Sequence, residues 1–402
     1  MICPQLIRAV KAHLLIAGGG IGALAAALAA CRAGCSVQLF EQTAAFSEVG
    51  AGLQLGPNAT RILQAWGLGA ALDGVAAFPE RIVARSSTSG RELACLPQQA
   101  LQRYGAPYAT LHRRDLHAIL LQAVQTQAAA QLHLGSAVDR FEESVQAVQL
   151  QLMDGRQAQG DALIGADGLW SRVREQALAD GRAQPTGHLA YRTLIARADL
   201  PAALRAHEVS VWLGVRQHVV AYPVRGGQWL NLVVIVQGAA SQELPGWDDV
   251  GAAADVRQAL ANCCSTLQAL AEAAPSWGRW SLYDRAPLSS AAQMAGGRIA
   301  LLGDAAHPMR PFLAQGAAMA IEDATELGAA LAMQRAGQVD ITAALAHYAQ
   351  QRWQRAARVQ ARARRNGQIF HLAGPLRLAR NTALQLAGSR LMDLPWLYGH
   401  GR

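Results

Sequence analysis

The stretch His13-Leu-Leu-Ile-Ala-Gly-Gly-Gly-Ile-Gly-Ala23, close to the amino terminus, decides the fold. Its apolar beginning, His13 to Ala17, predicts a short strand, and the glycines lead into an alanine-rich helix from about Ala23 to Arg32. Ser36 to Phe40 alternates as a second strand, which ends at Glu41. Strand, glycine-rich turn, helix, strand and acidic residue follow one another in the order of a dinucleotide-binding βαβ unit.

This pattern predicts how a dinucleotide is held. Glycines at the turn let the backbone approach a pyrophosphate, whose charge is stabilised by the free N–H groups at the start of the helix. Ala23 replaces the third glycine of the fingerprint, which tolerates alanine there, and Glu41 is expected to accept hydrogen bonds from the adenosine ribose. The predicted nucleotide contacts are Gly18, Gly20, Gly22, Ala23, Glu41 and Gln42. The fingerprint alone does not separate NAD from FAD.

The composition is that of a globular protein with a large core. The chain has 402 residues, of which 51% are hydrophobic and 16% charged, and this length predicts two interlocked domains. The formal net charge is +8, and Lys11 is the only lysine, so arginine carries nearly all of the positive charge. One arginine run has near-helical spacing and predicts a solvated helix face rather than a nucleic-acid surface. Its members are Arg352, Arg355, Arg358, Arg362, Arg364 and Arg365.

Neither a metal site nor a membrane segment is predicted. The cysteines form no CxxC pair and no cluster with histidines at zinc spacing, so we expect buried thiols in a reducing cytoplasm. They are Cys3, Cys31, Cys35, Cys95, Cys263 and Cys264. Residues 14–30 carry no charge, but the glycines divide them into a strand and a helix, and no stable membrane insertion is expected.

The pattern changes in the middle of the chain. Ala162 to Gly165 and Arg298 to Leu302 predict two more buried strands, each running into a glycine and an aspartate. Between them, Glu208 to Gln237 alternates, is rich in β-branched residues and folds back at Arg225 to Gln228, which predicts an antiparallel hairpin. A sheet-rich insertion therefore separates two parts of an α/β domain. Beyond Ile341 the pattern is helical, punctuated by Gly374 and Pro375.

Further motifs occur in a fixed order along nearly the whole chain. They are Glu48-Val-Gly-Ala-Gly-Leu-Gln-Leu-Gly-Pro-Asn58, His112-Arg113-x-Asp115-Leu116, Gly165-Ala-Asp167-Gly168-x-x-Ser171-x-Val-Arg174, Leu302-Gly303-Asp304-Ala-Ala-His307-Pro308, Pro311, Gln315-Gly316-Ala317 and Glu322-Asp323-Ala324. With this set the chain resembles the group A flavoprotein monooxygenases. More narrowly, it resembles the subgroup of salicylate, 3-hydroxybenzoate and 6-hydroxynicotinate hydroxylases.

The resemblance implies an α/β (α+β) fold like that of p-hydroxybenzoate hydroxylase. A Rossmann-like FAD-binding domain would carry an inserted β-sheet substrate domain and C-terminal helices. We expect the first part of the FAD-binding domain at 1–180, with a short substrate-side excursion near 70–105, and the substrate domain at 181–288. The FAD-binding domain would return at 289–345, and the C-terminal helices would occupy 346–402.

The resemblance also implies the cofactors and their contacts. FAD is the bound cofactor, and NADH or NADPH is the co-substrate, served by the same Asp167 segment because no second fingerprint is visible. Arg113 would reach the FAD phosphates; without the resemblance, an ordinary surface ion pair explains it equally well. At the start of a helix expected near Ala318, N–H groups would stabilise the negative charge of reduced flavin. The remaining expected FAD contacts are Val49, Gly303, Asp304, Pro311, Gln315, Gly316 and Ala317.

For the chemistry, the resemblance implies that reduced flavin and O2 form a C4a-hydroperoxide, which hydroxylates an electron-rich ring. A base that removes the phenolic proton makes the ring more nucleophilic. His218 and Tyr222 lie four residues apart on a predicted strand, on one face and about 13 Å apart, and are expected to line the ring pocket. A core histidine in a cross-strand aromatic pair is the alternative. His307 is a rival base, unless it only positions Pro308.

The substrate is expected to be a small phenolic carboxylate. Arg192 and Arg310 are candidate partners for its carboxylate, each as readily explained by a structural ion pair, and Pro311 is expected to contact the ring. Pro311 stands where 3-hydroxybenzoate 6-hydroxylases have glutamine, and this favours salicylate-type hydroxylation over the 3-hydroxybenzoate 6-hydroxylase and 6-hydroxynicotinate 3-monooxygenase alternatives. O2 is the other partner, and the chain is expected to be a monomer or homodimer. A non-hydroxylating FAD oxidoreductase or an inactive flavin-binding protein is the alternative of another class.

Overall fold

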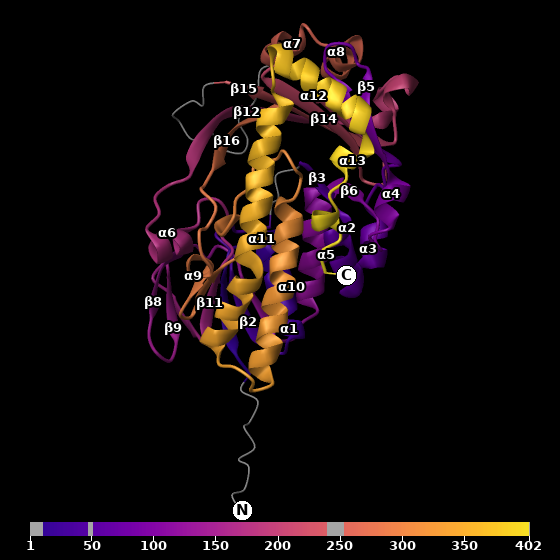
Figure 1. Cartoon of the computed structure of the whole chain (residues 1–402). Helices are drawn as coiled ribbons and strands as arrows, with labels where there is room; N and C mark the ends of the chain where they lie inside the picture. Colours follow the sequence, from indigo (N-terminus) through magenta and orange to yellow (C-terminus); the bar gives the residue numbers. More distant parts are fainter. Residues whose placement is uncertain (1–10, 47–50, 239–252, 402) are drawn as a thin grey trace, which may run out of the picture.

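The computed structural model describes residues 11–46, 51–238 and 253–401 (Figure 1). Two β-sheets form its framework, one in the lower half of Figure 1 and one across the top. The long helix α11 (Ile341–Phe370) runs from the lower sheet to the upper one.

The predicted βαβ unit is confirmed. It consists of β1 (His13–Ala17), α1 (Ile21–Arg32) and β2 (Ser36–Phe40), and the two strands are parallel. Both strands have the predicted ends, whereas α1 begins two residues before the predicted start. Gly20 caps this helix in an extended conformation, so its first turn forms directly after the glycines.

The lower sheet has six strands with the βαβ unit at its centre. Their order is β17-β18-β11-β1-β2-β7, and only the edge pair β17 and β18 is antiparallel. The four added strands are β7 (Ala130–His133), β11 (Ala162–Gly165), β17 (Ala295–Gly296) and β18 (Ile299–Leu301). The strands predicted at 162–165 and 298–302 are therefore confirmed as β11 and β18, which lie side by side.

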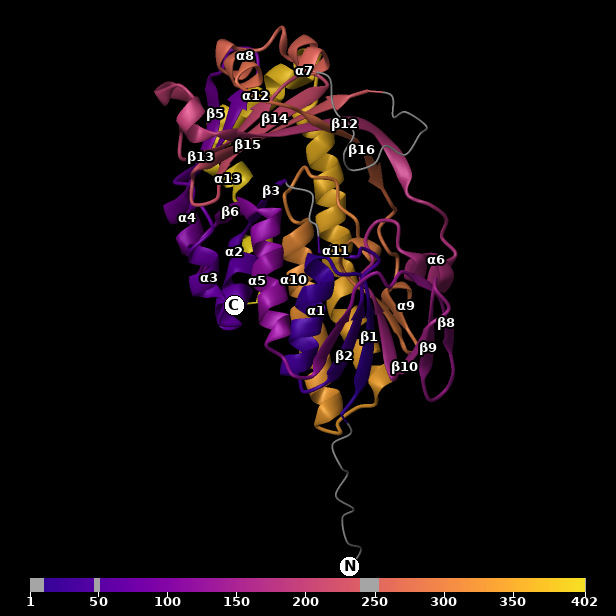
Figure 2. The ribbon, with the colours of Figure 1, turned by 180° about the vertical axis from the view of Figure 1, so that it is seen from behind.

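Helices cover one face of this sheet, and a small antiparallel sheet covers the other (Figure 2). On the helical side, α1 packs against α5 (Arg113–Gln125) and α10 (Gly316–Arg335). The small sheet consists of β8 (Val138–Glu143), β9 (Val148–Leu152) and β10 (Gln157–Gly160). All three layers contribute apolar side chains to one core.

The upper sheet has seven strands in the order β16-β12-β15-β14-β13-β4-β5. They are β4 (Arg81–Ser86), β5 (Glu92–Pro97), β12 (Gln184–Ala196), β13 (Glu208–Leu213), β14 (Gln217–Val224), β15 (Trp229–Gln237) and β16 (Gly278–Asp284). The predicted hairpin is confirmed by the antiparallel pair β14 and β15. Its turn has positive φ angles at Arg225, Gly226 and Gly227, and the two glycines adopt such angles without steric cost.

The two faces of the upper sheet have different neighbours. On its outer face, α7 (Ala253–Leu260) and α8 (Ser265–Glu272) bury alternate apolar residues of β12, β14 and β15. We call the opposite side, which points toward the lower sheet, the inner face (Figure 1). Phe312 and Phe370 pack against the inner face, so a layer of side chains lies between the two sheets.

Short elements complete the fold. They are β3 (Gly52–Leu55), α2 (Pro57–Ala65), α3 (Gly69–Asp73), α4 (Gln98–Gln102), β6 (Ala109–His112), α6 (Arg172–Leu178), α9 (Ala291–Met294), α12 (Gly374–Ala387), α13 (Ser389–Met392) and α14 (Pro395–Tyr398), with 3-10 turns at Arg197–Asp199, Ala202–Leu204 and Gly303–Ala305. The predicted break at Gly374 is confirmed, and this glycine has a φ of +54°. The domain boundaries given above remain predictions.

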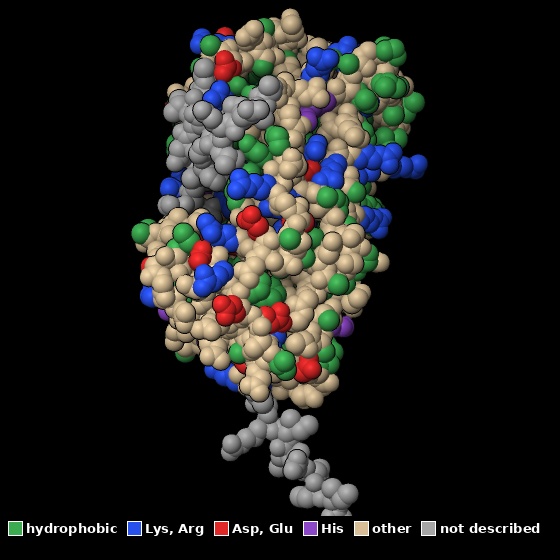
Figure 3. Space-filling view, turned by 90° about the vertical axis from the view of Figure 1, so that its left-hand side faces the viewer, with side chains coloured by type: hydrophobic (Ala, Val, Ile, Leu, Met, Phe, Trp, Pro, Cys, Tyr) green, Lys and Arg blue, Asp and Glu red, His purple; other side chains and the backbone are tan. Residues whose placement is uncertain are grey.

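The prediction of a solvated arginine face on α11 is wrong for half of the run. Arg352 is fully buried, and its guanidinium contacts the carboxylates of Glu322 and Asp323. Two more members of the run also bind carboxylates: Arg355 binds Glu322 and Arg364 binds Asp284. The reason is that α11 packs along α10 and passes the end of β16, so helical spacing turns part of the run inward. On the face shown in Figure 3, arginines lie in separate groups with acidic side chains among them.

Three findings concern the described residues only. None of the helices there combines the length and the apolarity that crossing a bilayer requires. Within the same ranges, no three metal-ligating side chains gather into a possible ion site. The five described cysteines are all free thiols.

Candidate functional site

The turn between β1 and α1 leaves open space where a pyrophosphate is expected. Gly18 has a φ of +104°, and a Cβ there would lie 2.4 Å from the carbonyl oxygen of Ala166, so only glycine fits. A Cβ at Gly20 would meet no atom within 4 Å. No side chain caps α1, and its first turn holds no acidic residue. Its first N–H groups are therefore available to a negatively charged group.

Glu41 lies beside this turn, as the fingerprint requires. Its Oε1 accepts hydrogen bonds from the backbone N–H and the hydroxyl of Thr43, both at 2.8 Å. The other oxygen, Oε2, faces Gly19, where an added Cβ would lie 2.7 Å away. One carboxylate oxygen thus remains for a ribose hydroxyl. Gln42 is exposed next to it, whereas Val49 lies outside the described residues.

Two predicted nucleotide contacts also serve helix packing through their small side chains. A Cβ at Gly22 would lie 3.1 Å from Cδ2 of Leu302 and 3.4 Å from Cβ of Ala320. Ala23 is fully buried in the core of the lower sheet. Both residues allow α1 to approach its neighbours closely, and their N–H groups lie in the first turn of the helix.

The carboxylate of Asp167 makes several local hydrogen bonds. Its carboxylate accepts hydrogen bonds from the Ser171 hydroxyl at 2.5 Å and from the backbone N–H groups of Arg172 and Val173 at 2.9 and 3.2 Å. Both oxygens are thus used to hold the loop at the start of α6. The adjacent Gly168, with a φ of +80° and no atom within 4 Å of an added Cβ, leaves its backbone open to a ligand.

Asp304 fits a cofactor contact best. It follows β18, and its carboxylate makes no hydrogen bond to any described residue. Solvent reaches the side chain, yet protein surrounds it, and this burial raises the pKa of its carboxyl, whereas the charges of Arg113 and His307 lower it. An acceptor in such a hollow suits sugar-alcohol hydroxyls, which are both donors and acceptors. Arg113, at the first position of α5, is close enough to act on it.

The amino end of α10 lies next to Asp304. A Cβ at Gly316 would meet a single atom within 4 Å, Oδ1 of Asp304 at 3.9 Å, so this end is open. Gln315 precedes the helix and is 2% exposed; its Oε1 accepts a hydrogen bond from Nδ2 of Asn58 at 3.0 Å. Its Nε2 has no partner in the described structure. Ala317 and Pro311 are half-buried nearby in sequence, and α10 begins two residues before the predicted start.

Arg174 connects two of these loops. The side chain is 1% exposed, and its Nη1 donates to the carbonyl oxygens of Ala305 and Ala306 at 3.0 and 2.7 Å. Its Nη2 contacts Asp180 at 2.5 Å. The loop that follows β11 and the loop that follows β18 are thereby held in one arrangement.

His307 does not have the environment of a free base. Its Nε2 lies 2.5 Å from Oδ2 of Asp323, which also accepts the backbone N–H of Gly303. Burial raises the pKa of Asp323, but the charges of His307 and Arg352 outweigh it and bring that pKa to about 2. The imidazole is therefore paired with a carboxylate that stays ionised, and the alternative of a positioning residue at the start of the turn fits better.

The inner face of the upper sheet holds the predicted ring-pocket residues. Alternation along the paired strands places six polar or aromatic side chains on it: His188, Arg192, His218, Tyr222, Asn231 and Trp280. His218 and Tyr222 lie on β14, as predicted, and are 0% and 4% exposed. Sequence patterning thus placed both residues correctly, although burial alone also agrees with the core alternative.

His218 and Tyr222 have different neighbours. The His218 ring lies 5.2 Å from that of Phe312, and its Nδ1 lies 2.8 Å from Nε2 of His371, while its own Nε2 has no described partner. Burial, together with His371 and His188, lowers the pKa of His218, which therefore stays neutral at pH 7. Burial raises the pKa of Tyr222, against the opposing effects of Arg192 and Gln54.

The two candidate carboxylate partners differ. Arg192 stacks on Trp280, with its Cζ 3.6 Å from the ring centroid, and no described carboxylate pairs with it. Burial lowers its pKa to about 9; Tyr222 opposes this and Arg113 adds to it. Arg310, in contrast, is bound to Asp284 at 2.7 Å. Arg192 thus has no carboxylate counterion in the part of the chain that the structure describes, whereas Arg310 forms a structural ion pair with Asp284.

Sequence reasoning missed several side chains of this region. Gln54 accepts a hydrogen bond from the Tyr108 hydroxyl at 2.7 Å, and Asn231 accepts one from the N–H of Gly52 at 2.8 Å. His371, which contacts His218, belongs to none of the sequence motifs. Asn231 did carry a signal, since it is a lone polar residue in the apolar run of β15.

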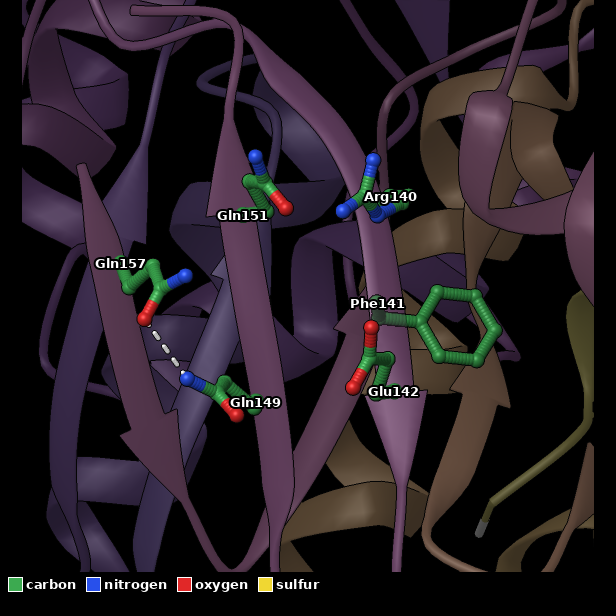
Figure 4. A pocket seen from close by; sticks show the side chains of 6 residues that line it. All are labelled: Arg140, Phe141, Glu142, Gln149, Gln151 and Gln157. Atoms are coloured by element: carbon green, nitrogen blue, oxygen red, sulfur yellow. Dashed lines mark hydrogen bonds between the residues drawn. The ribbon is translucent and has the colours of Figure 1, made fainter. Parts of the chain in front are cut away.

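A hollow elsewhere on the surface does not compete with this site (Figure 4). It lies on the small sheet and is lined by Arg140, Phe141, Glu142, Gln149, Gln151 and Gln157. Its volume of about 70 Å³ is well below the roughly 150 Å³ of a cavity that holds benzene. Two of its glutamines already bond to each other, at 2.7 Å.

Comparison with known proteins agrees with this geometry. The model of the FAD binding domain family matches residues 11–363. A 3-hydroxybenzoate 6-hydroxylase from Polaromonas naphthalenivorans is 38% identical over 391 residues, 96% of this chain and 95% of that one. A 6-hydroxynicotinate 3-monooxygenase from Bordetella bronchiseptica is 36% identical, over 87% of this chain and 90% of that one.

A solved salicylate hydroxylase substrate complex superposes with a TM-score of 0.80 at 25% identity, covering 97% of this chain and 96% of that one. The predicted fold class is thereby confirmed. The open turn at Gly20, the unpartnered Asp304 and the exposed start of α10 suit FAD, the cofactor for which the family is named. The chain therefore belongs to the FAD binding domain family and is an FAD-dependent aromatic hydroxylase.

Proposed function

We propose that this hydroxylase acts on a 3-hydroxybenzoate-type phenolic carboxylate, with reduced nicotinamide and O2 as co-substrates. Salicylate, the substrate that the proline at position 311 favours, is the second candidate substrate. The chain is 38% identical to a 3-hydroxybenzoate 6-hydroxylase and 25% identical to the salicylate hydroxylase. This difference along the whole chain outweighs the single residue Pro311. The observation that carries the proposal is Arg192, a half-buried cation on the inner face that no carboxylate of the described residues pairs with.

Strand register supports a substrate between Arg192 and His218. Arg192 pairs with Val233 of β15, which pairs with Val220 of β14, midway between His218 and Tyr222. Burial raises the pKa of Tyr222 and the charge of Arg192 opposes this rise, so the guanidinium lies nearer to the Tyr222 end of the pocket than to the His218 end. A carboxylate held by Arg192 would then direct the phenol toward His218, and a meta hydroxyl has the greater reach along the strand.

The chain's own groups supply binding and proton transfer. The bound FAD supplies the activation of O2. Arg192 would bind the substrate carboxylate with two parallel hydrogen bonds, and stacking on Trp280 keeps its guanidinium plane fixed. Neutral His218 would accept the phenolic proton at Nε2, which makes the ring a better nucleophile. Phe312 and Phe370 pack against the His218 ring and make its surroundings apolar.

A substrate panel tests the proposal. Purified holoenzyme is given 3-hydroxybenzoate, salicylate or 6-hydroxynicotinate with NADH or NADPH, and product is identified by mass spectrometry. We expect the largest stimulation of nicotinamide oxidation, with one oxygen atom added and no loss of CO2, for 3-hydroxybenzoate. Decarboxylated product from salicylate alone would restore the salicylate assignment. Oxidation without oxygenated product from any ring would favour a non-hydroxylating oxidoreductase.

Arg192→Met separates the carboxylate contact from general damage. A charge-assisted pair contributes about 1.5–3 kcal/mol, so KM for 3-hydroxybenzoate should rise roughly 10- to 100-fold. A phenol without a carboxylate serves as the matched control, and its turnover should be the same in variant and wild type. Equal KM values for the carboxylate substrate would contradict this role of Arg192.

A further inference from the structure

We propose that His371, at the carboxyl end of α11, is a positioning residue that sets the ring orientation and the proton arrangement of His218. Its imidazole would keep the proton of His218 on Nδ1 and leave Nε2 free to accept. The catalytic consequence rests on the proposed function, whereas the contact itself stands in the structure.

The contact is short and enclosed. Nδ1 of His218 and Nε2 of His371 lie 2.8 Å apart, with ring centroids 5.1 Å apart. The two residues are 0% and 7% exposed. Phe312 packs on both rings, at 5.2 and 5.8 Å, and Phe370 packs on His218 at 5.4 Å. The shared hydrogen bond is thus enclosed by side chains.

A bond between two imidazole nitrogens needs a single proton, and its position decides what His218 can do. With that proton on Nδ1 of His218, the bond is donated to His371 and Nε2 of His218 keeps its lone pair. With a proton on Nε2 of His371, that N–H donates to Nδ1 of His218, and the single proton of the neutral His218 lies on its Nε2, which becomes a donor. A phenol O–H pointing at Nε2 is satisfied only by the first arrangement.

Proton transfer leaves the pair intact. When the phenolic O–H bond breaks, its proton binds Nε2 of His218 and the electron pair stays on the phenolate oxygen. His218 is then an imidazolium that still donates Nδ1–H to His371. The positive charge thus keeps a hydrogen-bond acceptor in a buried place, where an unpaired charge is costly.

Backbone contacts hold His371 in place. Its carbonyl oxygen accepts the backbone N–H of Arg216 at 3.2 Å, which ties the end of α11 to the turn before β14. Arg380 of α12 donates to the carbonyl oxygens of Ile369 and Phe370 at 3.1 and 2.6 Å. The backbone that carries this ring is therefore held by two separate elements, and the contact with His218 orients the ring itself.

The charged and titratable groups around the pair favour neutral rings. His188 lies 5.2 Å from the His371 ring and bonds through its Nδ1 to Thr186. Burial, followed by His188 and Arg380, lowers the pKa of His371 to about 4. Arg310 lowers the pKa of His188, after burial. Both rings of the pair are thus uncharged at pH 7, as proton acceptance requires.

Paired variants test the proposal. His371→Leu removes the acceptor, and we expect kcat for hydroxylation to fall at least roughly tenfold, the smallest effect of losing such a supporting contact, with KM little changed. His371→Gln offers an amide oxygen to Nδ1–H and should restore most of the rate. His347→Gln, an exposed histidine on the same helix, is the control and should match wild type. Equal losses in the Leu and Gln variants would mean a packing role and overturn the proposal.

A second measurement does not depend on turnover. Nitrogen-15 labelling of histidine rings reports which nitrogen of His218 carries the proton in the substrate-free holoenzyme. Wild type and His371→Gln should show the proton on Nδ1, and His371→Leu a mixture of both forms. An unchanged His218 signal in His371→Leu would refute the positioning role. If instead wild type yields no hydroxylated product but shows the expected signals, the proposed function fails and the histidine pair stands.

Discussion

Removing Arg352 should destabilise the protein strongly. Its Nε lies 2.7 Å from Asp323, its Nη1 lies 2.8 Å from Glu322, and all three side chains are at most 2% exposed. Taking one partner from a buried ion pair costs about 3–5 kcal/mol. For Arg352→Met we expect the lower end, about 3 kcal/mol, because Glu322 keeps Arg355 and Asp323 keeps His307.

Thermal unfolding of the FAD-free chain measures this effect. At about 2 °C per kcal/mol for large domains, the melting temperature should fall by roughly 6 °C. Arg156→Met breaks an exposed pair with Asp154 and should change nothing measurable. Without Arg352 the buried carboxyls bind protons more readily, so the deficit at pH 7 should shrink on acidification to about pH 5. A melting temperature equal to that of the Arg156 control would refute the buried-network reasoning.

Other predictions concern the cofactor and acid stability. Asp304→Ala should retain its fold but lose most of its yellow FAD after gel filtration, and full flavin content would remove Asp304 from the site. Gly20→Val fills the open turn and should also abolish FAD binding, since its Cβ would stand where the pyrophosphate is expected. Because the pKa of His371 is lowered in the folded chain, the unfolded chain binds a proton at this histidine at a pH where the folded chain does not. Stability is therefore full above about pH 6.5 and declines toward about pH 4, by roughly 3 kcal/mol from this group at 1.36 kcal/mol per pH unit. The melting temperature of His371→Leu should depend less on pH over this range, and an identical profile would contradict the assignment.

The fold could be predicted where its signals are local. Strands β1 and β2 have their predicted ends because strand, turn and helix lie within one contiguous stretch. The hairpin turn at 225–228 was likewise visible in its glycines. The loops expected to hold the cofactor could be brought together from sequence because each motif follows a strand, and parallel strands bring their carboxyl ends to the same edge of a sheet.

The remaining parts depend on contacts between distant segments. His218 and His371 are separated by 153 positions, and no pattern along the chain pairs them. Arg352 and its neighbours have the spacing of a solvated face, and only the packing of α10 on α11 shows which of them point inward. Asp167 matches a cofactor motif but spends both oxygens on its own loop, a local bond that the motif does not reveal.

The central place of β1 in the lower sheet has a consequence for synthesis. Its neighbour β11 pairs with β18, so the turn at Gly20 and the acceptor at Asp304 are translated 284 residues apart. At about 5–20 residues per second, roughly 15 to 60 seconds pass between them on the ribosome. We expect nascent chains that stop before β18 to take up no FAD, and flavin fluorescence quenching on stalled chains of increasing length would show where uptake begins.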